Sequence, residues 1–374
     1  MDFTLDGEQT ALRDAVRSLL KEYDAERRRT TVAQAPGFDE EMWGRFAEMG
    51  LLGLPFAEDD GGMGAGPVEL AVVTEEIGRV LAPEPYVQAV VLAGGLVAAA
   101  GTPEQRKEVL GALSAGELVL AAALLEPDGR YDLAAGGVTA SDGRLDGVKD
   151  PVPGGARADL LVVSARTEAG LGLFLVEQGD GVEVTDRATF DGTRAARVSF
   201  TGAAATPLGD LAVDATPVLE RVAALARIAH AHEALGAMET ALALTTSYLT
   251  SRKQFGVTLN RFQALTFRAA DMYTSVELTR SIVTWATMVA ADPTSSHERV
   301  LEAASRATLQ VSRAGRHVGQ EAIQLHGGIG MTAEYAVGHF TARLTALDHL
   351  LGDARFHNAR LAQQLGDHDV VEPL

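Results

Sequence analysis

The chain contains no cysteine among its 374 residues. Disulfide bonds, thiolate catalysis and cysteine-ligated metals are therefore excluded, and we expect no metal site. Aromatic residues make up only 5% of the chain, and acidic residues outnumber basic residues by 51 to 32. The resulting net charge of −19 repels phosphate backbones and anionic lipids. We therefore expect neither nucleic acid nor a membrane surface as a partner.

Long hydrophobic runs are missing as well. The most apolar stretch, residues 89–101, is too short to span a bilayer and is rich in Ala and Gly. The first six residues, Met1 to Asp6, lack the basic segment and apolar run that mark a signal peptide. We expect a cytoplasmic protein whose hydrophobic content of 47% is enough for a large core in two or three domains.

The periodicity of apolar residues changes twice along the chain. We expect an N-terminal helical domain over residues 1–116, a β-sheet domain over 117–210 and a C-terminal helical bundle over 211–374. Helical spacing of apolar residues predicts helices over 38–49, 68–80, 87–100, 103–114, 218–248, 262–291 and 297–325. The lengths of the last three favour a four-helix bundle that also supplies contacts between subunits.

The middle region has short β-prone runs separated by Asp-Gly, Gly-Gly and Pro-Gly pairs. These pairs indicate tight turns, and the runs at 118–123, 160–164, 172–177 and 196–200 predict a small antiparallel sheet. An order of helices, strands and again helices is typical of the α+β class.

Three groups of motifs are spread over the chain. The first comprises Trp43, Gly50–Pro55, Glu58, Gly61–Gly64 and Glu75–Arg79; the second comprises Tyr248–Gly256, Phe262 and Gln263; the third comprises Gln324–Gly330, Glu334 and Tyr335. Together and in this order they resemble the acyl-CoA dehydrogenase family over almost the whole chain. The resemblance implies that family's fold: a helical domain, a small β domain and a four-helix bundle.

The resemblance also implies FAD as the cofactor, an acyl-CoA thioester as the substrate and an electron-transfer flavoprotein as the acceptor. Members remove a proton from the α carbon of the thioester and a hydride from the β carbon. The matching positions that would contact a flavin, bound mainly by a neighbouring subunit, are Arg252, Phe255, Gln263, Gln324, Gly327 and Gly328.

These residue types suit a nucleotide, although each has a plain structural alternative. The guanidinium of Arg252 presents paired donors that match phosphate oxygens. Gly327 and Gly328 would let backbone N–H groups approach closely, because no Cβ intervenes. The alternatives are a solvated helix arginine and a helix-ending turn. We expect His326, within the same motif, to be a packed or solvated histidine rather than a proton carrier.

The sequence departs from the family at the catalytic base. A carboxylate must remove the α proton, since that proton is only weakly acidic. In most members this Glu follows the glycine turn, and counting from Tyr335 without gaps places Leu351 there. Other members carry it early in the first long C-terminal helix, where this chain has Ala226 beside Arg227. We expect no catalytic base in the chain and a substrate-binding role for Arg227.

Nearby acids are weak substitutes for the missing base. Glu220 and Glu233 would lie roughly 9–11 Å along the helix from Ala226, which is too far for a simple replacement. Asp353 is the better surrogate for position 351, but it also suits a helix cap or a solvated surface position.

The segment that holds the ring of a subunit's own flavin is altered too. By resemblance, a Thr that would hydrogen-bond the ring is replaced by Leu125, and an aromatic-Ile-Thr run is replaced by Pro151-Val152-Pro153, which removes two backbone donors.

The pattern is similar to the small β-type subunit of bacterial heteromeric (α2β2) acyl-CoA dehydrogenases, which pairs with a catalytic subunit. Two alternatives stay open: an active homo-oligomeric dehydrogenase with a relocated base, and a non-enzymatic acyl-CoA-binding or structural paralogue.

Overall fold

The computed structural model describes residues 4–134 and 136–367. The N-terminal region is helical: α1 (Gly7–Leu19), α2 (Ala25–Val32), α3 (Glu40–Glu48), α4 (Pro67–Val80), α5 (Gly95–Ala100) and α6 (Pro103–Ser114). The side chains of Asp6, Asp39 and Thr102 cap α1, α3 and α6 by accepting a backbone N–H. The helix expected over 87–100 begins as a π-helix, Val87–Gly94, before it continues as α5.

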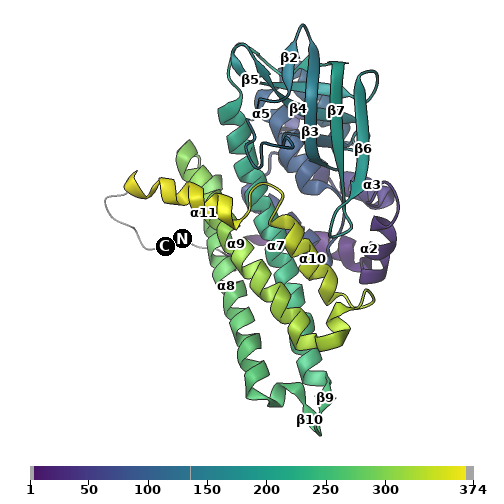
Figure 1. Ribbon diagram of the computed structural model, residues 1–374, viewed down its shortest axis with the longest axis vertical. Coiled ribbons are helices and arrows are strands. Elements are labelled where there is room, and N and C mark those ends of the chain that lie inside the picture. Colours follow the sequence, from purple (N-terminus) through teal and green to yellow (C-terminus); the bar gives the residue numbers. More distant parts are fainter. Residues whose placement is uncertain (1–3, 135, 368–374) are drawn as a thin grey trace.

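The middle region forms a strongly twisted sheet at one end of the molecule (Figure 1). Its strands are β1 (Leu120–Ala123), β2 (Thr139–Ser141), β3 (Arg144–Pro153), β4 (Leu160–Thr167), β5 (Gly170–Glu177), β6 (Val182–Ala188), β7 (Arg194–Ala204) and β8 (Thr206–Pro207). The order is β6-β7-β3-β2-β4-β5-β8, with β1 added on β4. The pairing is mainly antiparallel, as expected, but β1 and β2 both run parallel to β4. Hairpin signals in the sequence could not reveal these two pairs, because parallel neighbours are joined by long connections.

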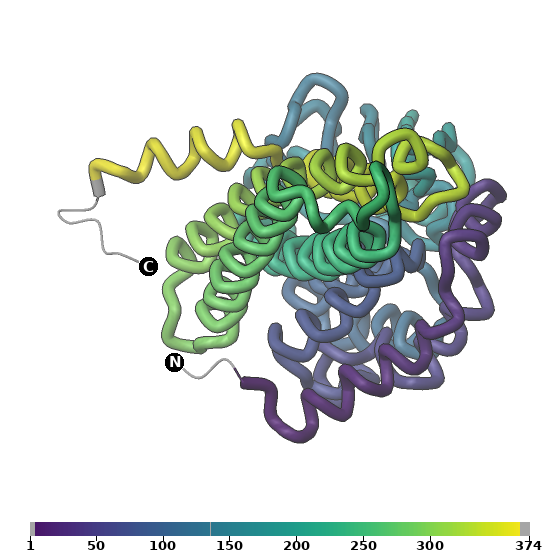
Figure 2. Tube along the Cα trace, turned by 90° about the horizontal axis from the view of Figure 1, so that it is seen from below, coloured from purple at the N-terminus to yellow at the C-terminus, as the bar shows by residue number. Residues whose placement is uncertain are grey.

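The expected bundle is formed by α7 (Thr216–Ser251), α8 (Gln263–Ala291), α9 (His297–His326) and α10 (Val337–Leu347). A short hairpin, β9 (Lys253–Gln254) with β10 (Val257–Thr258), follows α7, and α11 (Ala354–Gln363) lies against α9. Figure 2 looks onto the hairpin end of the bundle, where α7, α8 and α9 lie side by side. The three long helices begin and end within three residues of the predicted positions.

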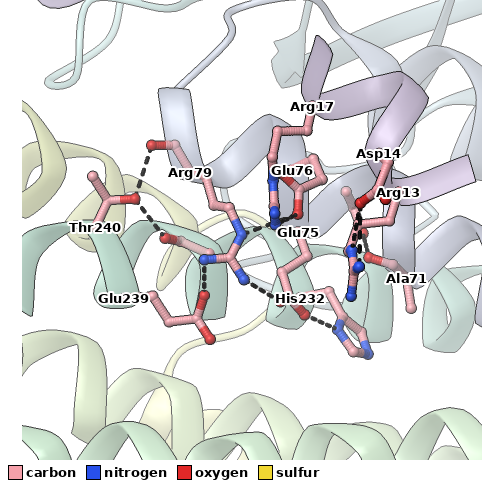
Figure 3. Close-up of polar contacts among 12 residues, drawn as sticks. Arg13, Asp14, Arg17, Ala71, Glu75, Glu76, Arg79, His232, Glu239 and Thr240 are labelled. Atoms are coloured by element: carbon pink, nitrogen blue, oxygen red, sulfur yellow. Dashed lines mark hydrogen bonds and ion pairs between the residues drawn. The ribbon is translucent and has the colours of Figure 1, made fainter. Parts of the chain in front are cut away.

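The motif Glu75–Arg79 holds α4 against α7. A Cβ on Gly78 would stand 1.9 Å from the Glu233 carbonyl oxygen, and one on Gly236 would stand 2.1 Å from the Glu75 carbonyl oxygen. The two helices can therefore touch backbone to backbone only because both positions are glycine. Ionic contacts flank this crossing, where Arg79 lies among Glu75, Glu76 and Glu239 (Figure 3).

Among the described residues, every helix is either too short or too polar to cross a membrane.

Candidate functional site

The motif residues expected to contact a flavin gather at the hairpin end of the bundle. Arg252 directly follows α7, Gln263 begins α8, and Gln324 lies in the last turn of α9. Tyr248 near the end of α7 stacks on His326 at the end of α9, with 4.6 Å between ring centroids, and this joins the two helix ends. Residues that are 72 positions apart in the sequence, Arg252 and Gln324, therefore belong to one surface.

This surface is open to solvent. Arg252, Gln263 and Gln324 are exposed, and Phe255 is 92% exposed with its ring edge against Phe262. In the described part of the chain, no carboxylate forms an ion pair with Arg252, so its guanidinium is available to an anionic group. Donors of this kind suit the phosphate groups of a nucleotide, and the contact itself stays a prediction.

The glycine turn offers the clearest fit to a cofactor. A Cβ added to Gly327 or Gly328 would meet nothing within 4 Å, so neither glycine is required by packing inside this chain. Gly327 also has a left-handed φ of 66°, which favours glycine for conformational reasons. For Gly328 no such backbone reason exists, and the open space above it can admit a ligand close to the backbone.

His326 belongs to the interior of the turn and not to its surface. It is 3% exposed, packs against the rings of both Tyr248 and Tyr335, and places its Nδ1 2.7 Å from the Ala322 carbonyl oxygen. Burial lowers its pKa, which keeps the ring neutral. The expectation of a packed histidine is confirmed.

The two base positions both lie inside hydrocarbon. Ala226 is fully buried and Leu351 is 8% exposed, and they belong to one core cluster that also joins the N-terminal helices to the sheet. A carboxylate at either place would have to be desolvated by that cluster. Neither position can accept a proton.

Arg227 is buried and holds the chain near Leu351. Its Nε donates to the Leu351 carbonyl oxygen at 2.9 Å, and the residue is 4% exposed. Burial, with the nearby Arg360, lowers the pKa of Arg227 to about 10. Burial and these same two arginines lower the pKa of His357 to about 3, so this histidine stays neutral. The expected role of Arg227 in substrate binding stays a prediction, whereas its observed contact is with the backbone.

Four of the positions at which the sequence departs from the family pattern line one very small cavity. Its volume is about 20 Å³, and Leu125, Pro151, Pro153 and Leu351 all line it. A space of this size holds about one water molecule. Its lining includes one titratable group, His230, whose Nδ1 lies 3.1 Å from Glu233 Oε2. No carboxylate lines this cavity, and its volume is too small for an acyl chain.

A wider groove of about 1240 Å³ is also lined by Leu125 and Pro151, together with Asp353. The Asp353 side chain caps α11 by accepting the Phe356 backbone N–H at 2.8 Å. Its expected role as a helix cap is confirmed. Of the other acids considered, Glu220 pairs with His297 and Arg360, and Glu233 is committed to Arg343.

Leu125 is followed directly by Glu126, which forms a buried ion pair with Lys149 that sequence patterns did not predict. Lys149 is completely buried, and its Nζ donates to Glu126, to the Leu124 carbonyl and to Ser164. Glu126 also accepts two backbone N–H groups, at 2.7 and 3.0 Å. Burial lowers the pKa of Lys149, and Glu126 opposes that effect. With its hydrogen bonds satisfied inside the protein, this pair fixes the loop rather than serving a ligand.

A second buried network links four segments of the chain. Arg343 of α10 donates to Glu233 of α7 at 2.7 Å and to Asp191, in the turn between β6 and β7, at 2.8 Å. Arg28 of α2 donates to the Asp191 carbonyl oxygen at 2.9 Å. Sequence patterns could not identify this network, because its hydrogen-bonded partners are up to 163 positions apart.

Comparison with known proteins agrees with the geometry. Residues 6–117 match the acyl-CoA dehydrogenase N-terminal domain and residues 216–366 match its C-terminal domain. Acyl-CoA dehydrogenase FadE27 of Mycobacterium tuberculosis is 32% identical, over 88% of this chain and 89% of that protein. IpdE2 of the same organism, also an acyl-CoA dehydrogenase, is 30% identical over 96% of this chain and 97% of that protein.

Solved structures are similar over almost the whole chain. A chain of a Tcur3481–Tcur3483 steroid ACAD variant has a TM-score of 0.88 and 32% identity, covering 97% of this chain and 99% of that one. A chain of the ChsE4–ChsE5 complex from Mycobacterium tuberculosis has a TM-score of 0.89 and 28% identity, covering 99% and 100%. These likenesses support FAD as the cofactor, and the protein belongs to the acyl-CoA dehydrogenase family.

Proposed function

We propose that this chain is the base-lacking subunit of a heteromeric, FAD-dependent acyl-CoA dehydrogenase, in which a second subunit carries the catalytic carboxylate. The observation that supports this most strongly is the closed site: Leu351 and Ala226 lie in one hydrocarbon core, and the cavity that Leu125, Pro151 and Leu351 line together has only about 20 Å³. The exposed surface at the hairpin end of the bundle is the second observation that supports the proposal.

The chain's contribution would be to bind and orient a flavin whose ring lies in the partner. Arg252 would donate paired N–H groups to the pyrophosphate, and Gln263 and Gln324 would offer side-chain amides. The turn at Gly327 and Gly328 would let the backbone approach the same nucleotide. When bound, the flavin supplies a hydride acceptor for the β carbon of the thioester. The α proton must leave to a carboxylate of the partner, since this chain offers none there.

The similarity to chains of the ChsE4–ChsE5 complex and of the Tcur3481–Tcur3483 steroid ACAD supports an assembly of two different polypeptides. The second of these favours a bulky acyl-CoA as the substrate of the pair. An electron-transfer flavoprotein as the acceptor rests on family resemblance alone.

Co-expression with a Glu-bearing dehydrogenase subunit tests the proposal. We expect a stable complex that contains half a flavin per polypeptide and oxidises an acyl-CoA, while the isolated chain oxidises none. Arg252→Met should lower the flavin content of the complex, because it removes the phosphate donor. Arg29→Met, on the exposed side of α2, is the matched control and should leave the flavin content unchanged.

Two results would contradict the proposal, and each favours one alternative. Bleaching of a flavin by an acyl-CoA in the isolated chain would indicate an active homo-oligomer with a relocated base. Purification without flavin, both alone and with every candidate partner, would indicate a non-enzymatic paralogue.

A further inference from the structure

Positive charge is concentrated on the outer side of α9, which lies beside α8 at one edge of the molecule (Figure 2). Between Glu302 and Glu321, every Asp, Glu, Lys or Arg of α9 is an arginine, namely Arg306, Arg313 and Arg316. Arg313 and Arg316 are exposed, and the side chain of Arg306 is 31% exposed. In a chain with a net charge of −19, three neighbouring arginines without an acid between them call for an explanation.

The chain does not neutralise this charge by itself. Arg306 pairs with Glu302 of the same helix, and Glu321 pairs with Arg268 of α8. In the part of the chain that the structure describes, no carboxylate pairs with either of the other two arginines. Since the acids at both ends of this stretch are already paired, two guanidinium groups remain available to a carboxylate from outside.

A row of apolar side chains on α8 accompanies the arginines. Phe267 and Leu278 are 58% and 57% exposed, and Trp285 is half-buried. These three positions are 11 and 7 residues apart, so they follow one line along the helix to within about 20°. The guanidinium of Arg306 lies over the Trp285 ring, 5.9 Å from its centroid, which joins the row to the arginines. Aromatic side chains and arginine are the residues enriched at the centre of protein–protein interfaces.

The arginines also lie in line with the surface proposed to meet the flavin. Arg306 and Gln324 are 18 residues apart, which is about five full turns, so both side chains leave α9 in the same direction. Arg313 deviates from this direction by only about 20°. A subunit whose flavin reaches Gln324 would therefore also lie along the arginines, over about 27 Å of α9.

A second copy of this chain is a poor occupant of this surface. In a two-fold contact the same patch is used on both subunits, so two α9 helices would cross antiparallel with the arginines of one copy facing those of the other. Like charges brought together at an interface oppose association. A different polypeptide with acidic side chains at this place avoids the repulsion.

We propose that the outer face of α8 and α9 is the docking surface for the Glu-bearing catalytic subunit, and that this subunit presents carboxylates to the arginines and apolar side chains to α8. The docking surface is defined by Phe267, Leu278, Trp285, Arg306, Arg313 and Arg316. The inference rests on the proposed function and adds to it the surface that selects a different, acidic partner over a second copy of this chain.

Reversing the charge of the two unpaired arginines tests the docking surface. The probe is the Glu-bearing dehydrogenase subunit of the co-expression experiment, supplied with FAD, and its affinity for the full chain is measured by biolayer interferometry. We expect Arg313→Glu combined with Arg316→Glu to weaken binding at least about tenfold, because attraction becomes repulsion. Raising NaCl from about 0.05 M to about 0.5 M should bring the two affinities closer, since salt screens exposed charges.

Matched controls separate docking from general charge and from folding. Lys21→Glu combined with Arg29→Glu makes the same change in net charge at exposed positions near α2 and should bind as the wild type does. Leu278→Asp should weaken binding, whereas Val213→Asp, at a position 64% exposed before α7, should not. All variants should unfold within about 2 °C of the wild type, because the substituted side chains are exposed.

The docking surface is overturned if the double arginine reversal binds the partner as tightly as the wild type, or if the control pair weakens binding equally. Self-association of the isolated chain that the same reversal abolishes would identify a second copy as the occupant and would also overturn it. In each case a complex that still holds half a flavin per polypeptide preserves the proposed subunit role. Absence of any complex with the Glu-bearing subunit would overturn both.

Discussion

The Arg343 network allows a stability prediction whose size follows from the structure. Arg343→Met removes the only arginine that pairs with the Asp191 and Glu233 carboxylates among the described residues, and both side chains are at most 3% exposed. Burial raises the pKa of Asp191, yet Arg343 and the neighbouring threonine hydroxyls lower it to about 2, from an ordinary value of 3.8. At about 1.4 kcal/mol per pKa unit, this carboxylate alone contributes about 2 kcal/mol at neutral pH.

Glu233 adds to the free energy of unfolding that Asp191 contributes. Burial raises its pKa, but Arg343 and His230 lower it below the usual range. Breaking a buried ion pair by removing one partner typically costs about 3–5 kcal/mol, because an unpaired charge remains inside the protein. We therefore expect Arg343→Met to reduce the free energy of unfolding by about 3–5 kcal/mol at neutral pH.

Urea unfolding followed by circular dichroism measures the effect. Arg45→Met, which breaks a largely exposed ion pair with Glu41, is the control and should cost at most about 1 kcal/mol. Both network carboxyls have lowered pKa values, so the stability they contribute is present above their unfolded pKa and is lost as the pH falls. The difference between wild type and Arg343→Met should accordingly shrink below about pH 4. A loss no larger than that of Arg45→Met at neutral pH would refute the reasoning.

Three further substitutions have expected outcomes. Gly236→Ala should destabilise the chain by about 3 kcal/mol in urea unfolding, because its Cβ would stand 2.1 Å from the Glu75 carbonyl oxygen. Gly328→Ala should change stability by less than about 0.5 kcal/mol, since its Cβ meets nothing within 4 Å, while lowering the flavin content of the complex with the partner subunit. Glu84→Gln should leave stability unchanged near pH 4 and raise it by about 3 kcal/mol above pH 7, because the raised pKa of Glu84, about 7 against 4.5, costs the folded wild type stability as the pH rises.

Local patterns predicted the long helices well. Apolar spacing placed α7, α8 and α9 within three residues of their ends, because each carries apolar side chains over many turns. The same reasoning missed the π-helix at Val87–Gly94, where the residues are almost all apolar and give no preference for one helical period. The domain boundaries at 116/117 and 210/211 stay predictions.

Features that depend on pairs of distant residues could not be predicted from local patterns. Gly78 and Gly236 look like ordinary helix-weakening glycines until α4 and α7 cross. Glu84 looks like a solvated acid between two prolines, and only the packing of Tyr23 and Asp39 around it reveals a buried carboxyl group. Motif counting named Ala226 and Leu351 as base positions, which stays a prediction, but the size of the cavity beside Leu351 depends on Leu125 and Pro151, which come from other parts of the chain.

Two regions of this chain contrast with each other, one closed and one open to solvent, and this contrast bears on the proposed role. Around Leu351 the chain is closed by hydrocarbon, which offers no group that could take a proton from an acyl thioester. At the bundle tip, Gly328 is free of any packing need for glycine, and Arg252 is exposed without an ion-paired carboxylate in the described part of the chain. Stability alone explains neither of these residues, since Ala at 328 and a neutral side chain at 252 would fold equally well. A requirement from outside the chain would account for both, and the proposed flavin, bound across a subunit boundary, would supply one.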